Sequence, residues 1–487
     1  DGGAGSDWLD FLNFTNTAEI SLSTGGATNF ENISGSGGSE TIKGDANANI
    51  LTGAGGTDIL YGYAGNDILA GSYRGTTTLS RITNWGSDTN SWNNADNAGN
   101  NTLYGGAGDD KLYGGYYDDT LDGGTGTDTL TGGNGNDTFV IRTGDGSTTL
   151  ANANVITDFS DGADVIGLDN DLAFSQLTIA QGTGAYASHT LVSVTATGEY
   201  LLILQNTTAS NITAADFSST STVAQTFTGT SGNDVFIGGA GNDTFNGAAG
   251  SDELYGHGGN DTFNITGKSG AFTDIIIGGT GTDTLDIDYT GVDSLSDFTI
   301  TYDSTNGYIV LTDANGGAIK FSSIENLTVG DYAYTRAQDR DDDYADAYWS
   351  ATEAKLYLWD GNGTNVSGVL DPGDDEALPG LTKTMDVTVY GSDGDDYFNL
   401  NINRTDDYTG NWTFSMGAGD DSFGAAALIN GDSVDMGAGD DSVALMINSH
   451  TPTVAGLSLV KLDGGAGSDW LDFLNFTNTA EISLSTG

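Results

Sequence analysis

The chain has 487 residues, of which 75 are Gly, only 3 are Pro and none is Cys. Asp and Glu outnumber Lys and Arg by 68 to 13, giving a formal net charge of −55, which disfavours nucleic acid and anionic membranes as partners and favours cations. A hydrophobic fraction of 37% argues against intrinsic disorder, the lack of Cys excludes disulfides and thiol chemistry, and no apolar run approaches the length of a membrane span.

The two ends of the chain carry the same segment. Residues 1–25, DGGAGSDWLDFLNFTNTAEISLSTG, recur unchanged as residues 463–487, an offset of 462 (463 − 1). A merely shared motif would drift at its unconstrained positions. We therefore expect one period of a tandem array of 462-residue units, followed by the first residues of the next copy. A head-to-tail polymer of separate chains would leave the same signature.

A nine-residue pattern, G-G-x-G-x-D-x-U-x with U apolar, follows the first segment. It begins at Gly35 and repeats through GAGGTDILY (53–61) and GYAGNDILA (62–70). An insertion rich in Asn, Ser and Trp covers 72–95, and the pattern then resumes over 96–140. Regular repetition at this period predicts a solenoid.

A second run of the same pattern starts at residue 229. It has four copies in phase up to residue 264, then an insertion over 265–277 and the copy GGTGTDTLD at 278–286. Glu40, Asn49 and Asn101 stand where the pattern expects Asp, so metal sites are doubtful at those turns.

Each nonapeptide predicts a turn followed by a short strand, and two of them make one 18-residue coil of a right-handed parallel β-roll. Glycine lets the turn adopt positive φ and exposes its carbonyls. The apolar residue at position 8 is expected to point inward and stack on its counterpart one coil away. These core residues are Leu60, Leu69, Leu112, Leu121, Leu130, Phe139, Phe236, Phe245, Leu254, Phe263 and Leu285.

The Asp at position 6 has the largest functional consequence. Residues 18 apart lie in adjacent coils, which stacks Asp110 on Asp128, Asp119 on Asp137, Asp234 on Asp252 and Asp243 on Asp261. At a strand spacing of ~4.8 Å and an effective dielectric near 20, two carboxylates repel by roughly 3 kcal/mol. Oxygen ligands without His or Cys suit Ca²⁺ better than Zn²⁺, so we expect multiple calcium ions between the coils.

These tandem nonapeptides resemble those of the RTX family, secreted bacterial proteins whose repeats form calcium-binding parallel β-rolls. The resemblance implies that the carbonyls at positions 2 and 4 and the carboxylate at position 6 bind Ca²⁺ together with the next coil. It also implies an extracellular, cell-surface location with export by type I secretion. The metal-site residues so assigned are Asp7, Asp58, Asp67, Gly106, Gly108, Asp110, Asp119, Gly124, Gly126, Asp128, Gly133, Gly135, Asp137, Asp234, Gly239, Gly241, Asp243, Asp252, Gly259, Asp261, Gly279, Gly281, Asp283, Asp396, Asp421, Asp441 and Asp469.

The segments outside the nonapeptides complete the expected organisation. Residues 137–217 resemble the β-strand segment that closes the roll of serralysin-like proteases, and there Asp158, Asp161 and Asp164 form either a calcium site or ordinary turns. From residue 391 the motif recurs once per longer coil, at 391–398, 416–423, 436–443 and 464–471. The expected order is: β-helix leading into a β-roll, 1–71; insertion loop, 72–95; β-roll, 96–140; β-strand cap, 141–228; second β-roll, 229–286; antiparallel β module, 287–390; long-coil β-helix running into the next copy, 391–487.

No catalytic constellation is recognisable, so we expect the chain not to be an enzyme. The three His residues lie outside any H-E-x-x-H motif, and G-x-S-x-G is absent. Gly267-Lys268-Ser269 resembles the end of a phosphate loop, but Thr262 stands in place of its first glycine. The acidic run 339–348 is interpreted as a solvated loop, and DGNGTN (360–365) is a weak match to a calcium loop.

Three functions fit these features. The first is a structural repeat of a filament or surface layer, whose partners are further copies of itself, head to tail. The second is an adhesin that binds a host, a cell-surface glycan or a neighbouring cell through modules containing Trp85, Trp92, Trp349 and Trp359; exposed Trp would favour it. The third, the secretion segment of a protease or lipase, conflicts with the 462-residue repeat.

Overall fold

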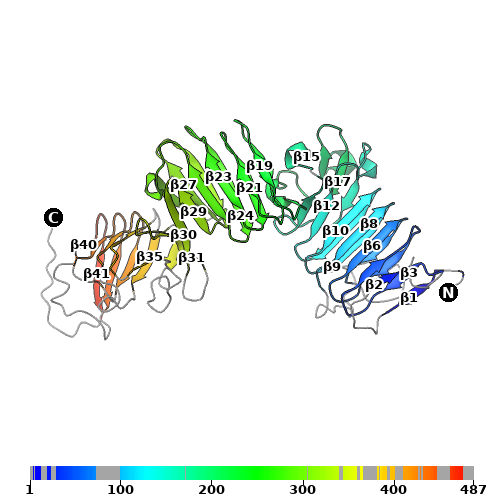
Figure 1. Ribbon diagram of the computed structural model, residues 1–487, viewed down its shortest axis with the longest axis horizontal. Coiled ribbons are helices and arrows are strands. Elements are labelled where there is room, and N and C mark those ends of the chain that lie inside the picture. Colours follow the sequence, from blue (N-terminus) through cyan, green and yellow to red (C-terminus); the bar gives the residue numbers. More distant parts are fainter. Residues whose placement is uncertain are drawn as a thin grey trace. The chain divides into compact units, whose positions relative to one another are not determined.

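A computed structural model gives the fold of the chain (Figure 1). It describes residues 4, 6–11, 19–22, 29–72, 99–170, 172–303, 305–338, 344–358, 362–365, 381–382, 384–391, 395–400, 410–425, 428, 431–446 and 461–474. The chain divides into two compact units, one of residues 1–222 with 237–240 and one of 223–236 with 241–487. Each unit is described separately.

The first unit consists of two sheets between which the chain alternates. The order of one sheet is β1 (Trp8–Asp10), β3 (Asn32–Ser34), β5 (Ile50–Thr52), β7 (Ile68–Ala70), β9 (Lys111–Tyr116), β11 (Thr129–Asn134), β13 (Asn154–Ile156), β17 (Tyr200–Leu204), β16 (Thr190–Val194) and β15 (Leu177–Gln181). The order of the other is β18 (Phe217–Ser219), β14 (Val165–Leu168), β12 (Thr138–Ile141), β10 (Thr120–Thr125), β8 (Thr102–Ala107), β6 (Ile59–Ala64), β4 (Thr41–Lys43) and β2 (Glu19–Ser21).

The second unit contains three sheets. The longest runs β19 (Thr226–Thr228), β21 (Thr244–Asn246), β23 (Thr262–Thr266), β25 (Thr284–Asp288), β29 (Asn326–Val329), β30 (Tyr332–Gln338), β31 (Tyr344–Ser350), β32 (Lys355–Leu358), β34 (Val387–Tyr390), β36 (Trp412–Ser415), β38 (Ser433–Asp435) and β40 (Lys461–Asp463). A six-stranded sheet runs β20 (Val235–Ile237), β22 (Glu253–Gly258), β24 (Thr273–Thr280), β28 (Ala318–Ser322), β27 (Tyr308–Asp313) and β26 (Phe298–Asp303), and a five-stranded sheet runs β33 (Asn362–Asn365), β35 (Asp395–Leu400), β37 (Ser422–Ala425), β39 (Ser442–Met446) and β41 (Trp470–Leu474).

Helical structure is limited to single 3₁₀ turns among the described residues. They are η2 (Leu150–Asn152), η3 (Phe174–Gln176), η4 (Gly184–Tyr186), η5 (Ala214–Asp216) and η6 (Leu295–Asp297). No helix in this part of the chain is long and apolar enough to cross a membrane. The expected all-β parallel solenoid is confirmed.

The register of the strands confirms the 18-residue coil. β10 pairs with β8 in parallel, with Leu121 opposite Leu103, and β11 pairs with β9, with Leu130 opposite Leu112. Position 8 forms the core: every predicted core residue is buried except Phe236, which is partly buried. In the second unit, Phe227, Phe245 and Phe263 stack with ring centroids 4.8 and 4.7 Å apart, a ladder of aromatic rings one coil apart.

The first insertion leaves the roll in phase. Ile59 of β6 lies opposite Thr102 of β8, and the offset of 43 equals one 18-residue coil plus 25 inserted residues. Residues 73–98, including Trp85, Trp92 and Asp96, lie outside the described residues. Because the strands on either side pair directly, the insertion does not interrupt the sheets.

The second insertion is shorter than the segment 265–277 expected from the sequence. Glu253 lies opposite Ile275, an offset of 22, which leaves only 265–268 as inserted residues. Residues 269–277 form another nonapeptide, with Asp274 at position 6 and a buried Ile276 at position 8. The sequence concealed this copy because Ser269 and Phe272 stand at positions where glycine is expected.

Antiparallel strands flank the parallel coils. β15, β16 and β17 pair antiparallel beyond β13, and Arg142 ties the neighbouring coils together through ion pairs with Asp122, Asp145 and Asp169. In the second unit, β26 to β28 and β29 to β32 pair antiparallel, but they extend the sheets of the roll. The expected strands of 287–390 are thus part of the same sheets.

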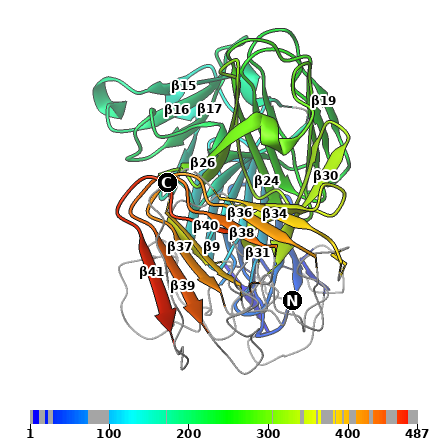
Figure 2. The same ribbon diagram turned by 90° about the vertical axis from the view of Figure 1, so that its left-hand side faces the viewer.

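Long coils follow from β33 to β41. Ser422 of β37 lies opposite Tyr397 of β35 and Ser442 of β39, and Ser442 lies opposite Trp470 of β41. These offsets equal the spacing of the motif in the sequence, and Figure 2 shows β37, β39 and β41 side by side. Trp349 and Trp412 are buried in this unit, whereas Trp359, residues 339–343 and residues 359–361 lie outside the described part of the chain.

Candidate calcium-binding turns

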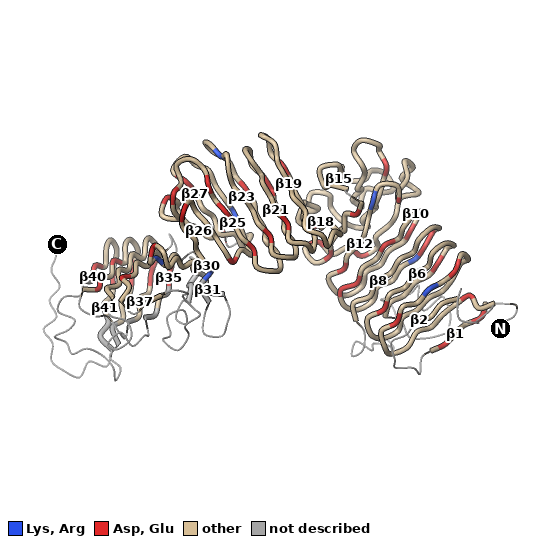
Figure 3. The backbone as a smooth tube through the Cα atoms, in the orientation of Figure 1, with Lys and Arg blue, Asp and Glu red and all other residues tan. Residues whose placement is uncertain are grey.

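The carboxylates at position 6 form a ladder along each side of the first roll. The backbone N–H of Asp110 donates to Oδ1 of Asp128 at 2.9 Å, and that of Asp119 donates to Oδ1 of Asp137 at 2.9 Å. The bonds continue across the insertion, since the N–H of Asp67 donates to Oδ1 of Asp110 at 2.7 Å. Each carboxylate is therefore positioned by the backbone of the preceding coil, and acidic residues recur from coil to coil (Figure 3).

The second carboxylate oxygen of these residues is buried and has no hydrogen-bond partner. Desolvating an unpaired carboxylate oxygen is costly, so each such atom needs a cation or a proton. The turns with this arrangement are called open turns below. Among the described residues their position-6 carboxylates are Asp7, Asp58, Asp67, Asp110, Asp119, Asp128, Asp137, Asp261, Asp283, Asp421 and Asp441; Oδ2 of Asp274 also lacks a hydrogen bond, but it is ion-paired to Lys268 and its turn is not counted as open.

Burial changes the acidity of these groups. It raises the pKa of the Asp119 carboxyl to about 8, and that of Asp128 and Asp137 to about 7. In the long coils it raises the pKa of Asp421 to about 8, and the neighbouring Asp396 and Asp441 add to this shift. A metal-free turn thus holds its negative charge poorly near neutral pH.

Glycines at positions 2 and 4 make room for carbonyl oxygens between the coils. Gly124 and Gly126 adopt φ of +83° and +143°, and a Cβ on either would collide with the carbonyl oxygen of Gly106 or Gly108 one coil away. Some non-glycine residues at positions 2 or 4 adopt the same left-handed region, at a cost of about 1–2 kcal/mol each. They are Ala54, Tyr63, Tyr117, Ala248 and His257.

Glycine at position 1 accommodates the carboxylate itself. A Cβ on Gly105 would lie 2.6 Å from Oδ2 of Asp110, and one on Gly114 would lie 2.5 Å from Oδ2 of Asp119. Each open turn therefore gathers one unpaired carboxylate oxygen and exposed carbonyls. No group of three or more Asp, Glu, His or Cys side chains suited to a metal occurs among the described residues, so at these turns backbone oxygens must complete the ligand set.

Comparison with known families identifies the repeat. The model of the RTX calcium-binding nonapeptide repeat matches residues 34–69, 95–115, 113–147, 228–263 and 269–286. The chain contains RTX nonapeptide repeats. RTX repeats bind calcium at multiple sites, and the donor set of the open turns, all oxygen with buried negative charge, fits Ca²⁺. Such repeats are typical of extracellular proteins.

Other comparisons add little. No curated protein matches the chain. The crystal structure of the extracellular lipase LipA from Serratia marcescens matches with 16% identity and a TM-score of 0.16, over 59% of this chain and 38% of the lipase. The chain thus spans about two fifths of that protein, and the similarity is too low to relate the two folds.

Some RTX turns are filled by the protein's own groups. Ser36 donates its N–H and its hydroxyl to the carboxylate of Glu40, and Thr230 donates both groups to Oδ2 of Asp234, at 2.7 and 3.1 Å. The turn of Asn49 is closed by the N–H of Asp45 at 2.7 Å. The sequence predicts Asp234 as a calcium ligand, but its Oδ2 atom already accepts the two hydrogen bonds from Thr230.

The cap carboxylates are also paired. Asp158 accepts the N–H groups of Gly132 and Gly133 at 3.0 and 2.9 Å, and Asp164 accepts those of Asp137 and Ser160 at 3.0 and 2.7 Å. Asp161 is exposed. These contacts fit the ordinary-turn alternative.

The remaining predicted ligands lie in equivalent places. Gly133 and Gly135, Gly279 and Gly281, and Gly259 have positive φ and face a carbonyl of the preceding coil. Gly239 and Gly241 approach backbone atoms of Ser221 and Val223 in the same way. Asp243 and Asp396 are buried, with their N–H groups bonded to Asp261 and Asp421. Asp7 and Asp469 occupy the ends of the described coils, and Oδ2 of Asp7 is unpaired.

The side chains at position 5 form a second ladder, which the sequence analysis did not predict. Oδ1 of Asp109 accepts the N–H of Thr127 at 2.9 Å, and Oδ1 of Asp118 accepts that of Asn136 at 2.8 Å. Asn233, Asn242 and Asn260 do the same in the second roll. The signal was available, because position 5 holds Asp, Asn, Ser or Thr in the repeats, apart from Ala48, although the pattern writes it as any residue. These side chains hold the outer part of each turn in register.

Proposed function

We propose that the chain is a calcium-stiffened structural repeat of an extracellular filament or surface layer, built from 462-residue units in tandem. The observation that carries the proposal is the pairing of the segment shared by the two ends. Trp8 and Trp470 are the same residue of that segment. Their strands have different neighbours: the strand of Trp8 pairs with the coil that follows the segment, and the strand of Trp470 pairs with the coil that precedes it.

The C-terminal copy pairs with the coil before it. β41 lies beside β39, with Trp470 opposite Ser442, and it is the last strand of its sheet. The N-terminal copy pairs with the coil after it, since β1 lies beside β3, with Trp8 opposite Asn32, and is the first strand of its sheet. A copy between two units would have both neighbours and would join the two parallel sheets into one.

The carboxylate ladder also supports a solenoid that continues across the junction between two units. The N–H of Asp441 donates to Oδ1 of Asp469, and the N–H of Asp7, the same residue of the repeat, donates to Oε2 of Glu31 at 2.8 Å. Trp470 is 76% exposed, whereas Trp8, with a following coil beside it, is half-buried. A unit placed after residue 474 would cover the surface that Trp470 presents.

The adhesin alternative receives less support from the described residues. Exposed Trp in the non-repeat segments would favour it, but Trp349 is only 2% exposed and packs in the core. In the proposed role the chain has no catalytic activity, and its partners are further copies of itself.

The test is a protein of two periods, residues 1–462 followed by residues 1–487, studied by hydrogen–deuterium exchange in calcium. The internal copy of WLDFLNFTNTA is expected to be protected, whereas the two terminal copies of that segment have a neighbour on one side only and exchange faster. Isotope labelling of only residues 1–462 of the second period marks the internal copy and leaves both terminal copies unlabelled. Equal exchange of the internal and terminal copies would contradict a solenoid that continues across the junction, and it would indicate that the units fold separately.

A further inference from the structure

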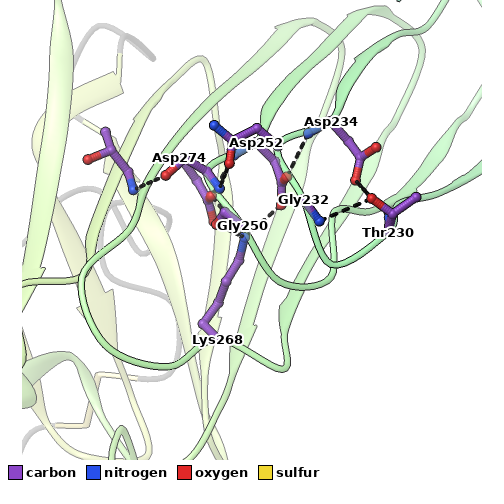
Figure 4. A network of polar contacts seen from close by, with 10 residues as sticks. Thr230, Gly232, Asp234, Gly250, Asp252, Lys268 and Asp274 are labelled. Carbon is purple, nitrogen blue, oxygen red and sulfur yellow. Dashed lines mark hydrogen bonds and ion pairs between the residues drawn. The ribbon is translucent and has the colours of Figure 1, made fainter.

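One turn of the second roll contains a buried lysine. Nζ of Lys268 lies 2.7 Å from Oδ2 of Asp252, 2.9 Å from Oδ1 and 2.8 Å from Oδ2 of Asp274, and 3.1 Å from the carbonyl oxygen of Gly250 (Figure 4). The side chains of all three ionic residues have no exposed surface. The ring of Phe272 lies 5.2 Å from Nζ and covers the ammonium group.

The four inserted residues bring the lysine to this place. β23 ends at Thr266 and β24 begins at Thr273, and the connection contains two left-handed glycines, Gly267 with φ of +68° and Gly270 with φ of +70°. No atom lies within 4 Å of a Cβ placed on either, so both are required for the path of the chain and not for packing. The tight loop turns Lys268 inward, toward the roll.

The groups around Nζ are the donor set of an open turn. Gly250 is at position 4 of its nonapeptide, Asp252 is at position 6, and Asp274 is at position 6 of the next coil. A calcium ion between two coils would be bound by these same oxygens. Correspondingly, Oδ2 of Asp252 has a partner, whereas the same atom of Asp261 and Asp283, on the other side of this roll, has none.

We propose that the ammonium group of Lys268 takes the place of a calcium ion between the coils of Asp252 and Asp274. This turn then binds no calcium, because a buried ammonium and a divalent cation cannot share the position. The preceding turn on the same side is filled as well, by the contacts of Thr230 to Asp234. The second roll accordingly has one side held by its own side chains and one side, with Asp261 and Asp283, held by calcium.

Native mass spectrometry of the full chain in calcium tests this assignment by counting bound ions. Lys268→Met removes the charge with little change in volume and is expected to bind one calcium ion more than the unchanged protein. Its melting temperature is expected to fall in EGTA and to recover in calcium. Lys111→Met, which alters an exposed lysine of the first roll, is the matched control and should change neither quantity. An unchanged ion count in folded Lys268→Met would overturn the proposal.

A second pair of variants covers the case in which Lys268→Met does not fold. Asp252→Asn alters a carboxylate of the lysine-filled turn and should leave the ion count unchanged, whereas Asp261→Asn alters an open turn and should lose at least one ion. Loss of an ion in Asp252→Asn would show that calcium, and not Lys268, occupies the turn.

Discussion

The first and second rolls use the same nonapeptide but neutralise its carboxylates differently. In the first roll, six position-6 Asp residues, from Asp58 to Asp137, keep an unpaired buried oxygen. In the second, the side of the roll that contains Asp252 is satisfied by Lys268 and Thr230. The comparison teaches that the motif specifies the geometry of the turn, while a few nearby residues decide what fills it.

The difference has an energetic consequence. A calcium ion stabilises the fold to an extent that depends on its concentration, and at tenfold over a Kd near 10⁻⁴ M each site contributes about 1.4 kcal/mol. A lysine within the chain is present at any calcium concentration. The first roll should therefore depend on calcium more steeply than the Lys268 side of the second.

Calcium removal should produce the largest difference in stability between the two rolls. In EGTA, the amides of β9 and β11 are expected to lose their protection from hydrogen exchange, because six open turns at about 1.4 kcal/mol each give about 8 kcal/mol of calcium stabilisation, which is comparable to the whole stability of a typical domain. The amides of β22 and β24, next to Lys268, should remain protected longest. Equal loss of amide protection in all strands would contradict a difference in calcium dependence between the two rolls.

Acid should partly replace calcium in the first roll. The pKa of Asp58 and Asp119 is raised from 3.8 to about 8 by burial, so the folded metal-free state binds protons more tightly than the unfolded state. This stabilisation is fully present below about pH 4 and is lost as the pH rises through 7 to 8. In EGTA the melting temperature should rise from pH 9 to pH 5. In excess calcium it should not, because protons then compete with the metal.

A methyl group in an open turn should weaken the first roll by about 3 kcal/mol, the sum of left-handed strain and overpacking. Gly126→Ala has both effects, since its φ is +143° and its Cβ would meet the carbonyl oxygen of Gly108. Gly144→Ala is the control: its φ is +104°, but no atom lies within 4 Å, so strain alone should cost about 1–2 kcal/mol. Thermal melts in calcium measure both. Equal losses would mean that the carbonyl stack is unimportant.

The smallest effect is expected at a filled turn of the first unit. Glu40→Gln keeps an acceptor for Ser36 and should cost about 1 kcal/mol without changing the number of bound calcium ions. Asp119→Asn, in an open turn, should lose at least one ion. A loss of calcium in Glu40→Gln would show that the turn of Glu40 is a metal site despite its internal contacts.

Much of the fold was predictable because the repeat is local. Glycines that need positive φ, an apolar residue at position 8 and a fixed period are all visible in the sequence, and so is the spacing of the long coils. The copy around Asp274 was missed because its turn lacks two of the glycines. Its coil is held by pairing with β22, which no local pattern shows.

The sequence by itself determined the solenoid, the calcium-binding class and the column of acidic residues, because each depends on residues within one nonapeptide and its regular repetition along the chain. Only the tertiary structure decided which turns are open. Thr230 lies four residues from Asp234, but Lys268 reaches Asp252 from 16 residues away, through a loop whose direction depends on the coils around it. The ammonium group of Lys268 is recognisable as the partner of this turn only in the folded structure, because the fold brings the two together.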